Sequence, residues 1–125
     1  MKDTLDQKHL SPEAYRVLCE CGTEAPGSSP LNDEKRPGSY QCAGCARPLF
    51  SSDHKHDSGS GWPSFFQPAT PEAVTYATDF HIGYARTEVR CAGCNGHLGH
   101  VFDDGPAPTG KRYCINGVAI AFTSA

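Results

Sequence analysis

The chain has 125 residues, a length typical of one domain with a modest core. Hydrophobic residues make up 38% of it, and 13 glycines and 10 prolines favour turns, so a source of stability besides apolar packing is expected. The formal net charge is -3 without a run of Lys or Arg, which argues against a nucleic-acid partner, and no apolar stretch approaches the roughly 20 residues of a membrane span.

The first predicted element is a short helix that follows a flexible, polar segment over residues 1–10. This segment contains no signal-peptide core, so we expect a cytoplasmic protein. Ser11 is suited to cap the helix and Pro12 to occupy its first position, and the helix should end by Gly22. Residues 11–125 are predicted to form a single domain. Nothing in the composition indicates an obligate interface, so we expect a monomer.

From residue 39 onwards the sequence predicts short strands separated by turns. Because regular short strands with little helix favour antiparallel sheets, the predicted fold is mainly β. Pro71 and Glu72 are suited to open a single helical turn before one of these strands. The predicted strands are Ser39–Gln41, Ala46–Ser51, Ala73–Asp79, Tyr84–Arg90, Val101–Phe102, and Arg112–Thr123 in one or two pieces.

Two Cys-x-x-Cys motifs give the strongest local signal. The chain has seven cysteines, an odd number, and no export signal, so metal binding or catalysis is favoured over disulfides. The segment Cys42-Ala43-Gly44-Cys45 is echoed by Cys91-Ala92-Gly93-Cys94, with a leucine at the same offset after each. Two such turns supply the four tetrahedral thiolates of a structural Zn²⁺ site. Two redox pairs, free core thiols, or a mixed site with His97 or His100 are the alternatives.

Cys114 is the candidate nucleophile among the three cysteines that remain. If its segment is a strand, Arg112, Cys114 and Asn116 share one face, while Tyr113 and Ile115 take the other. A cation on the same face favours the thiolate over the thiol. The alternative is a buried cysteine that acts as a small hydrophobic residue.

Two glycine-rich segments supply further candidates. His97 and His100 lie three residues apart just before the Cys114 segment, and histidine can transfer protons near neutral pH. Trp62, the only tryptophan, follows a glycine-rich loop and is able to present an aromatic face to a ligand. Surface histidines with satisfied hydrogen bonds and a tryptophan anchored in the core are the alternative interpretations.

In their order along the chain, these segments resemble the B-type methionine sulfoxide reductase family. The resemblance extends from about residue 13 to the C-terminus, and the order and spacing are specific although each motif alone is weak. The matching segments are Gly22-Thr23-Glu24, Tyr40-Gln41-Cys42-Ala43-Gly44-Cys45, Gly61-Trp62-Pro63-Ser64-Phe65, Val89-Arg90-Cys91-Ala92-Gly93-Cys94, His97-Leu98-Gly99-His100-Val101-Phe102-Asp103-Asp104-Gly105-Pro106 and Gly110-Lys111-Arg112-Tyr113-Cys114-Ile115-Asn116.

The resemblance implies two small antiparallel sheets in a tent-like arrangement, short N-terminal helices, and a zinc ion held by both Cys-x-x-Cys motifs. It implies reduction of the R epimer of methionine sulfoxide, free or within proteins, with Cys114 as nucleophile. It also implies that Trp62 packs on the substrate methyl group and that Phe102 belongs to the substrate-binding residues. The polar side of the pocket is expected to consist of His97, His100, Arg112 and Asn116.

These residue types fit the chemistry that the resemblance implies. A sulfoxide sulfur is electrophilic, but its oxygen leaves only when it is protonated. We therefore expect the Cys114 thiolate to attack sulfur while His100, or His97 through water, delivers the proton. Methionine then leaves, and Cys114 becomes a sulfenic acid.

The sequence departs from the family pattern at the resolving cysteine. Many members have a cysteine two residues before the tryptophan, and here that position is Ser60, which cannot form a disulfide. Cys21, or alternatively Cys19, is expected to attack the Cys114 sulfenic acid, and thioredoxin would reduce the resulting disulfide. Direct reduction by an external thiol is the third possibility.

Two other classes of protein compete with the reductase. A non-catalytic zinc-ribbon interaction module would explain the four cysteines of the two motifs but not Cys114, Trp62 or the histidines. A thiol redox sensor that uses Cys114 and Cys21 would oxidise readily but would not turn over methionine sulfoxide.

Overall fold

The computed structural model describes residues 12–20, 22–23, 29, 31, 34–56, 61–80, 85–106 and 109–124. The predicted flexible segment 1–10, together with Cys21 and Ser60, lies outside the described residues. The helical elements are α1 (Pro12–Glu20) and the single 3-10 turns η3 (Ser52–His54), η4 (Pro71–Ala73) and η5 (Gly117–Ala119). The strands are β1 (Gly38–Cys42), β2 (Pro48–Ser51), β3 (Lys55–His56), β4 (Ser64–Phe65), β5 (Val74–Asp79), β6 (Arg86–Cys91), β7 (His97–Phe102), β8 (Arg112–Ile115) and β9 (Ile120–Ser124).

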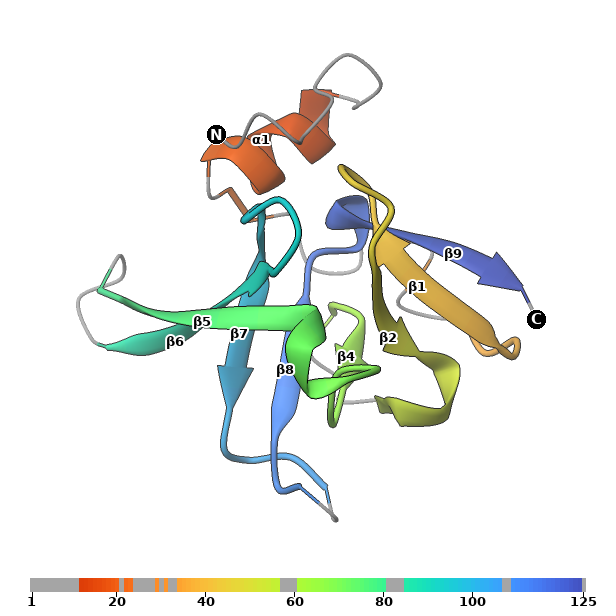
Figure 1. Cartoon of the computed structure of the whole chain (residues 1–125). Coiled ribbons are helices and arrows are strands. Elements are labelled where there is room, and N and C mark those ends of the chain that lie inside the picture. Colours follow the sequence, from red (N-terminus) through yellow and green to blue (C-terminus); the bar gives the residue numbers. More distant parts are fainter. Residues whose placement is uncertain are drawn as a thin grey trace.

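The strands form two antiparallel sheets that lie side by side (Figure 1). The smaller sheet has three strands in the order β2-β1-β9, and the larger has six in the order β3-β4-β8-β7-β6-β5. The chain passes from β8 in the larger sheet through η5 into β9 in the smaller one, so the C-terminal segment connects the two. The predicted mainly β fold with two antiparallel sheets is confirmed.

The core lies where the two sheets face each other. Phe50 of the smaller sheet stacks on Phe65 of the larger, with ring centroids 4.4 Å apart, and Tyr40 meets Phe65 edge to face at 5.0 Å. All three side chains are fully buried, and each aromatic pair adds about 0.5–1.5 kcal/mol to the hydrophobic contribution. This aromatic contact fixes β4, and with it the neighbouring Trp62 loop, against the smaller sheet.

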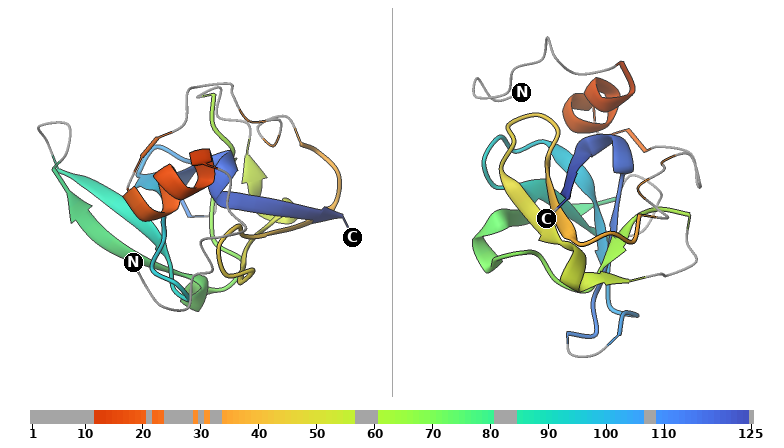
Figure 2. Two further views of the ribbon diagram at one scale, coloured as in Figure 1. Left: turned by 90° about the horizontal axis from the view of Figure 1, so that it is seen from above. Right: turned by 90° about the vertical axis from the view of Figure 1, so that its right-hand side faces the viewer.

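Helix α1 lies outside the sheets and packs against η5 and β7 (Figure 2). Its buried residues are Ala14, Val17 and Leu18, which recur at the three- and four-residue spacing of one helix face. A helix of 9 residues is too short to be stable alone, so α1 is held in place by this packing. Among the described residues, no helix has the length and apolar character that crossing a bilayer requires.

The helix, the turn at Pro71 and most strands agree with the sequence prediction, but three differences stand out. Only one α-helix occurs in the described N-terminal part, where several short helices were expected. β3 and β4 were not predicted because two residues are too few to show alternation. β7 begins at His97, whereas the predicted strand began at Val101. The prediction missed the first residues of β7 because they include Gly99 and have weak strand propensity.

Candidate active site

Four cysteine sulfurs meet at the junction of the two sheets. Cys42 and Cys45 come from the turn after β1, and Cys91 and Cys94 from the turn after β6. All four Sγ atoms lie within 4.8 Å of one another, with Cys42 and Cys94 at 3.7 Å and Cys45 and Cys91 at 3.5 Å. Tetrahedral zinc with bonds of about 2.3 Å requires sulfurs about 3.8 Å apart. The cluster is therefore able to hold a metal ion of that size.

The two Cys-x-x-Cys turns have the same local geometry, as their sequence echo predicted. In each, the backbone N–H of the glycine donates to the first cysteine Sγ at 3.3 Å. Ala46 and Asn95, the residues after the second cysteine, both adopt a positive φ, 66° and 64°. Hydrogen bonds from Cys91 and Cys94, together with burial, raise the pKa of Cys42, because such close sulfurs cannot all be anionic without a cation.

Cys114 lines a cavity of about 310 Å³ on the larger sheet, well separated in sequence from the four-cysteine cluster. It lies at the centre of this sheet, paired with His100 of β7 on one side and Ser64 of β4 on the other. Its side chain is half-buried, whereas Tyr113 and Ile115 point into the core. The cavity is lined by Thr23, Trp62, Arg86, Gly99, His100, Phe102, Arg112, Cys114 and Asn116.

Two glycines shape the surroundings of Cys114. A Cβ at Gly99 would lie 2.0 Å from the carbonyl oxygen of Cys114, so only glycine lets β7 approach β8 this closely. Gly61 has a φ of 91°, which L side chains rarely adopt, and this turn directs the chain into Trp62. The loop is then fixed by the Ile115 N–H, which donates to the Pro63 oxygen at 2.9 Å. Trp62 is thereby held beside Cys114.

The guanidinium of Arg112 is held by a carboxylate and an aromatic ring. Its Nε and Nη2 donate to the two oxygens of Asp104 at 2.8 and 3.2 Å, and its carbon lies 4.6 Å from the centre of the Phe102 ring. These contacts leave Arg112 on the same cavity wall as Cys114. The hydrogen bond to Asp104 is the largest cause of the raised pKa of Arg112, and a smaller contribution comes from Cys114. Arg112 is therefore charged and interacts with the Cys114 sulfur.

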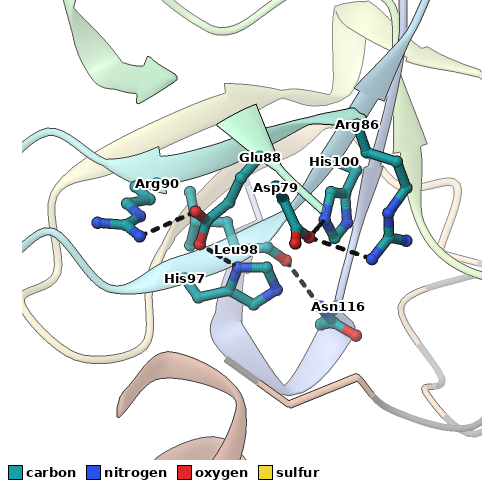
Figure 3. Close-up of polar contacts among 8 residues, drawn as sticks. All are labelled: Asp79, Arg86, Glu88, Arg90, His97, Leu98, His100 and Asn116. Atoms are coloured by element: carbon teal, nitrogen blue, oxygen red, sulfur yellow. Dashed lines mark hydrogen bonds and ion pairs between the residues drawn. The ribbon is translucent and has the colours of Figure 1, made fainter. Parts of the chain in front are cut away.

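His100 forms an acid–histidine pair inside the sheet (Figure 3). Its Nε2 donates to Asp79 Oδ2 at 2.7 Å, and the same oxygen accepts from Arg86 Nη2 at 3.1 Å. A carboxylate is only an acceptor, so the hydrogen lies on Nε2 and the exchangeable position of the ring is Nδ1. Asp79 thus fixes which nitrogen of His100 is free to exchange a proton.

His97 forms a second pair of the same kind next to the first (Figure 3). Its Nδ1 donates to Glu88 Oε2 at 2.6 Å, and the other Glu88 oxygen pairs with Arg90 Nη2 at 2.9 Å. Burial lowers the pKa of His97, and this effect outweighs the hydrogen bond to Glu88, which would raise the pKa. His97 is therefore neutral near pH 7, with its ring centre 5.4 Å from that of His100.

The structure brings most of the predicted site residues to one cavity. Trp62, His100, Phe102, Arg112, Cys114 and Asn116 all line it. His97 stands apart, because it does not line this cavity, although its ring touches that of His100. Neither histidine belongs to the four-cysteine cluster, so the mixed metal site is not what the structure forms. Cys19 lies on α1, where it packs against the core.

Several residues of the site were not predicted. Asp79, Arg86, Glu88, Thr23 and Gly99 are absent from the sequence-based set, yet they bond the histidines or line the cavity. The alternation of Arg86, Glu88 and Arg90 on β6 was a usable signal that these side chains share a face. Their partners on β5 and β7 depend on strand register, which no local pattern contains.

Comparison with known proteins identifies the family of this chain. A family model described as the SelR domain matches residues 10–124, and the peptide methionine sulfoxide reductase MsrB of Agrobacterium fabrum is 54% identical over 116 residues. The chain belongs to the MsrB family. That alignment covers 93% of this chain and 86% of the relative. The family predicted from the sequence motifs is thus confirmed.

Two further members of the MsrB family are similarly close. The peptide methionine sulfoxide reductase MsrB of Thioalkalivibrio sulfidiphilus is 53% identical over 119 residues, which are 95% of this chain and 87% of the relative. The MsrB protein of Leifsonia xyli subsp. xyli is 52% identical over 117 residues, 93% of this chain and 84% of the relative. The chain therefore spans nearly the full length of these relatives.

Proposed function

We propose that this chain reduces the R epimer of methionine sulfoxide, free or within proteins, to methionine through Cys114. The observation that carries the proposal is the cavity of Cys114, which combines a thiol, a guanidinium, an aromatic wall and a histidine–carboxylate pair. A non-catalytic zinc-ribbon interaction module would not explain why these groups lie together in one cavity. A cytoplasmic location and a monomeric state remain predictions from the sequence.

The first step transfers the sulfoxide oxygen to Cys114. The Cys114 thiolate attacks the substrate sulfur and forms a sulfur–sulfur bond, while the sulfoxide oxygen takes up one proton. The hydroxyl group then leaves the substrate sulfur and adds to Cys114 Sγ as the sulfur–sulfur bond breaks, which yields methionine and a Cys114 sulfenic acid. Arg112 places a positive charge on the same cavity wall as the attacking sulfur. His100 delivers the proton from Nδ1, since Asp79 holds its Nε2. Asn116 is buried, and its Nδ2 donates to the Leu98 oxygen at 2.9 Å, which ties the pocket floor to β7.

Replacing Asp79 by Asn is expected to lower kcat by at least about tenfold while changing KM less, because the amide can donate to Nε2 and stabilise the wrong tautomer of His100. Steady-state kinetics with dithiothreitol as reductant measure both constants. Asp103→Asn is the matched control, since this carboxylate pairs with Lys111 at the surface and does not line the cavity. Equal kinetics for the two variants would remove Asp79 from the mechanism.

Trp62→Ala is expected to raise KM for methionine sulfoxide by about tenfold, because the ring supplies the apolar wall against which the methyl group packs. The effect on kcat is expected to be smaller. The same kinetic assay measures it, with Phe66→Ala as an aromatic control that does not line the cavity. An unchanged KM would place the methyl group elsewhere.

The second step forms a disulfide with an N-terminal cysteine, and Cys21 is the better candidate. Cys21 lies outside the described residues, but Thr23 lines the Cys114 cavity, and two residues span at most about 7 Å. Cys19 packs from α1 against the core, so its thiol would reach Cys114 only after the helix opened. Attack of Cys21 on the sulfenic acid releases water, and thioredoxin then reduces the disulfide.

Cys21→Ser is expected to lose most thioredoxin-supported turnover and to retain turnover with dithiothreitol, which reduces the sulfenic acid directly. Cys19→Ser is the matched control and should retain both. The assay counts methionine formed with each reductant. If Cys19→Ser shows the selective loss, Cys19 resolves the intermediate, and if neither variant does, an external thiol reduces Cys114.

The four-cysteine cluster is proposed to hold a structural zinc ion. When bound, zinc would supply four strong bonds between the sheets rather than a reactive position, because four thiolates complete its tetrahedral shell. The donor set fits this ion in number, type and spacing. Cys42, Cys45, Cys91 and Cys94 would then hold the turns after β1 and β6 together.

The proposed function is tested by incubating the zinc-loaded protein with dithiothreitol and with the R or the S epimer of free methionine sulfoxide. The expected result is methionine from the R epimer alone. Turnover of the S epimer alone would contradict the stereochemical assignment. No methionine from either epimer would reject the reductase and favour a module without catalysis.

A further inference from the structure

His100 shares the oxygen that holds it with an arginine of the neighbouring strand (Figure 3). Asp79 on β5 and Arg86 on β6 are cross-strand partners, and His100 lies on β7. Asp79 Oδ2 accepts from His100 Nε2 at 2.7 Å and from Arg86 Nη2 at 3.1 Å. The side chains of Asp79, Arg86 and His100 are 19%, 17% and 10% exposed, so water and salt screen their charges only in part.

The second histidine–carboxylate pair is bonded differently, which makes it an internal comparison (Figure 3). Glu88 also pairs with a histidine and an arginine, but His97 contacts Oε2 and Arg90 contacts Oε1. Each donor there has an oxygen of its own, whereas at Asp79 both donors meet Oδ2. Two donors on one oxygen compete for the same electron density. The guanidinium at Asp79 therefore weakens the histidine bond more directly than the guanidinium at Glu88 does.

Charged and titratable groups surround His100 on each of the elements packed around it. In the described chain they are Arg16 of α1, Asp79 of β5, Arg86 and Glu88 of β6, His97 of β7, and Arg112 and Cys114 of β8. Among them, Asp79 is the group that hydrogen-bonds the imidazole. Arg86 is the cation on that same carboxylate, since Arg112 is held by Asp104. Its charge is thus the one placed to act on His100 through a shared partner.

We infer that Arg86 is a positioning residue for the proton transfer, because it neutralises Asp79 and so lets His100 release its proton. This inference rests on the proposed function, in which the proton passes from Nδ1 of the imidazolium to the sulfoxide oxygen and leaves a neutral ring with its hydrogen on Nε2. With Arg86 in place, Asp79 orients the ring without the full attraction of an unpaired carboxylate for an imidazolium. Without Arg86, the carboxylate holds the charged form of the ring more strongly, and His100 is a weaker acid.

The kinetic test follows the first turnover of free R-methionine sulfoxide at saturating concentration, by rapid quenching, over a range of pH. Its rate falls as pH rises past the point where His100 loses its proton. In Arg86→Gln this fall is expected about one pH unit higher than in the wild type, and the rate below it about threefold lower, because the acid is weaker. Arg86→Lys keeps a charge beside Asp79 and should restore most of both effects.

Proton NMR reads the same ring without turnover. The Cε1–H signal of His100, assigned with His100→Gln, is expected to titrate about one pH unit higher in Arg86→Gln than in the wild type. Arg90→Gln is the matched control, because it removes the same charge from Glu88, which bonds His97 instead, and it should move the His100 signal much less. Thermal unfolding checks that each variant is folded. Arg86→Met, which keeps the aliphatic part of the side chain, replaces Arg86→Gln if that variant does not fold.

The outcomes separate this role from a merely structural one. A larger shift in Arg86→Gln than in Arg90→Gln, which disappears when Asp79→Asn is also present, supports the inference. An unmoved His100 signal in the folded Arg86 variant, or an equal shift in Arg90→Gln, overturns it and leaves the proposed function intact. A wild-type protein that forms no methionine overturns the proposed function, and the inference with it.

Discussion

Removing the proposed zinc ion from the four-cysteine cluster is expected to unfold the protein. The cluster connects the turn after β1 in the smaller sheet to the turn after β6 in the larger, and Cys91 is fully buried. Structural zinc contributes on the order of 10 kcal/mol to folding. That amount is comparable to the whole stability of a typical domain, about 5–15 kcal/mol. The hydrophobic content of 38% leaves little to replace it.

Two experiments measure this effect. The first follows circular dichroism and zinc content while a strong chelator is added to the wild type. The second compares thermal unfolding of Cys91→Ser with that of Cys19→Ser, which removes a partly buried thiol outside the cluster. With the chelator, the wild type is expected to lose its structure in step with its zinc. In the thermal comparison, Cys91→Ser is expected to unfold at a lower temperature and Cys19→Ser is not. A protein that keeps its spectrum and unfolding temperature without metal would contradict the structural role.

Cys114→Ser is expected to abolish turnover of methionine sulfoxide, with a loss on the order of a thousandfold or more, because serine is a far weaker nucleophile and forms no sulfenic acid. The fold should remain, since the side chain is half-buried and serine is close to it in size. Methionine formation with dithiothreitol measures the activity, and thermal unfolding checks the fold. Substantial turnover by a folded Cys114→Ser would show that another residue attacks the sulfur.

The most local features of the molecule are the ones that the sequence predicted. The residues of the four-cysteine cluster lie in two short motifs, so their spacing alone identified them. Strand alternation was enough to place Arg112, Cys114 and Asn116 on one face, and all three line one cavity. In both cases the signal lies within a few residues of chain.

The features that were missed depend on contacts between distant segments. The pairing of Asp79 with His100 and of Glu88 with His97 follows from the register of β5, β6 and β7, which pairs Asp79 with Arg86 and Glu88 with His100 across the sheet. A one-residue shift in that register would reverse the faces, and the sequence of one chain does not show it. Gly99 is explained only by the closeness of Cys114 on the next strand.

The most direct test of the central claim is a stoichiometric reaction without any reductant. Wild-type protein, zinc-loaded and fully reduced, is mixed with excess R-methionine sulfoxide, and the methionine formed is counted per chain. Because Cys114 itself accepts the oxygen, the expected result is one methionine per chain from the wild type and none from Cys114→Ser. A wild type that forms no methionine, or a Cys114→Ser that forms as much, would contradict the assignment of Cys114 as the reducing thiol.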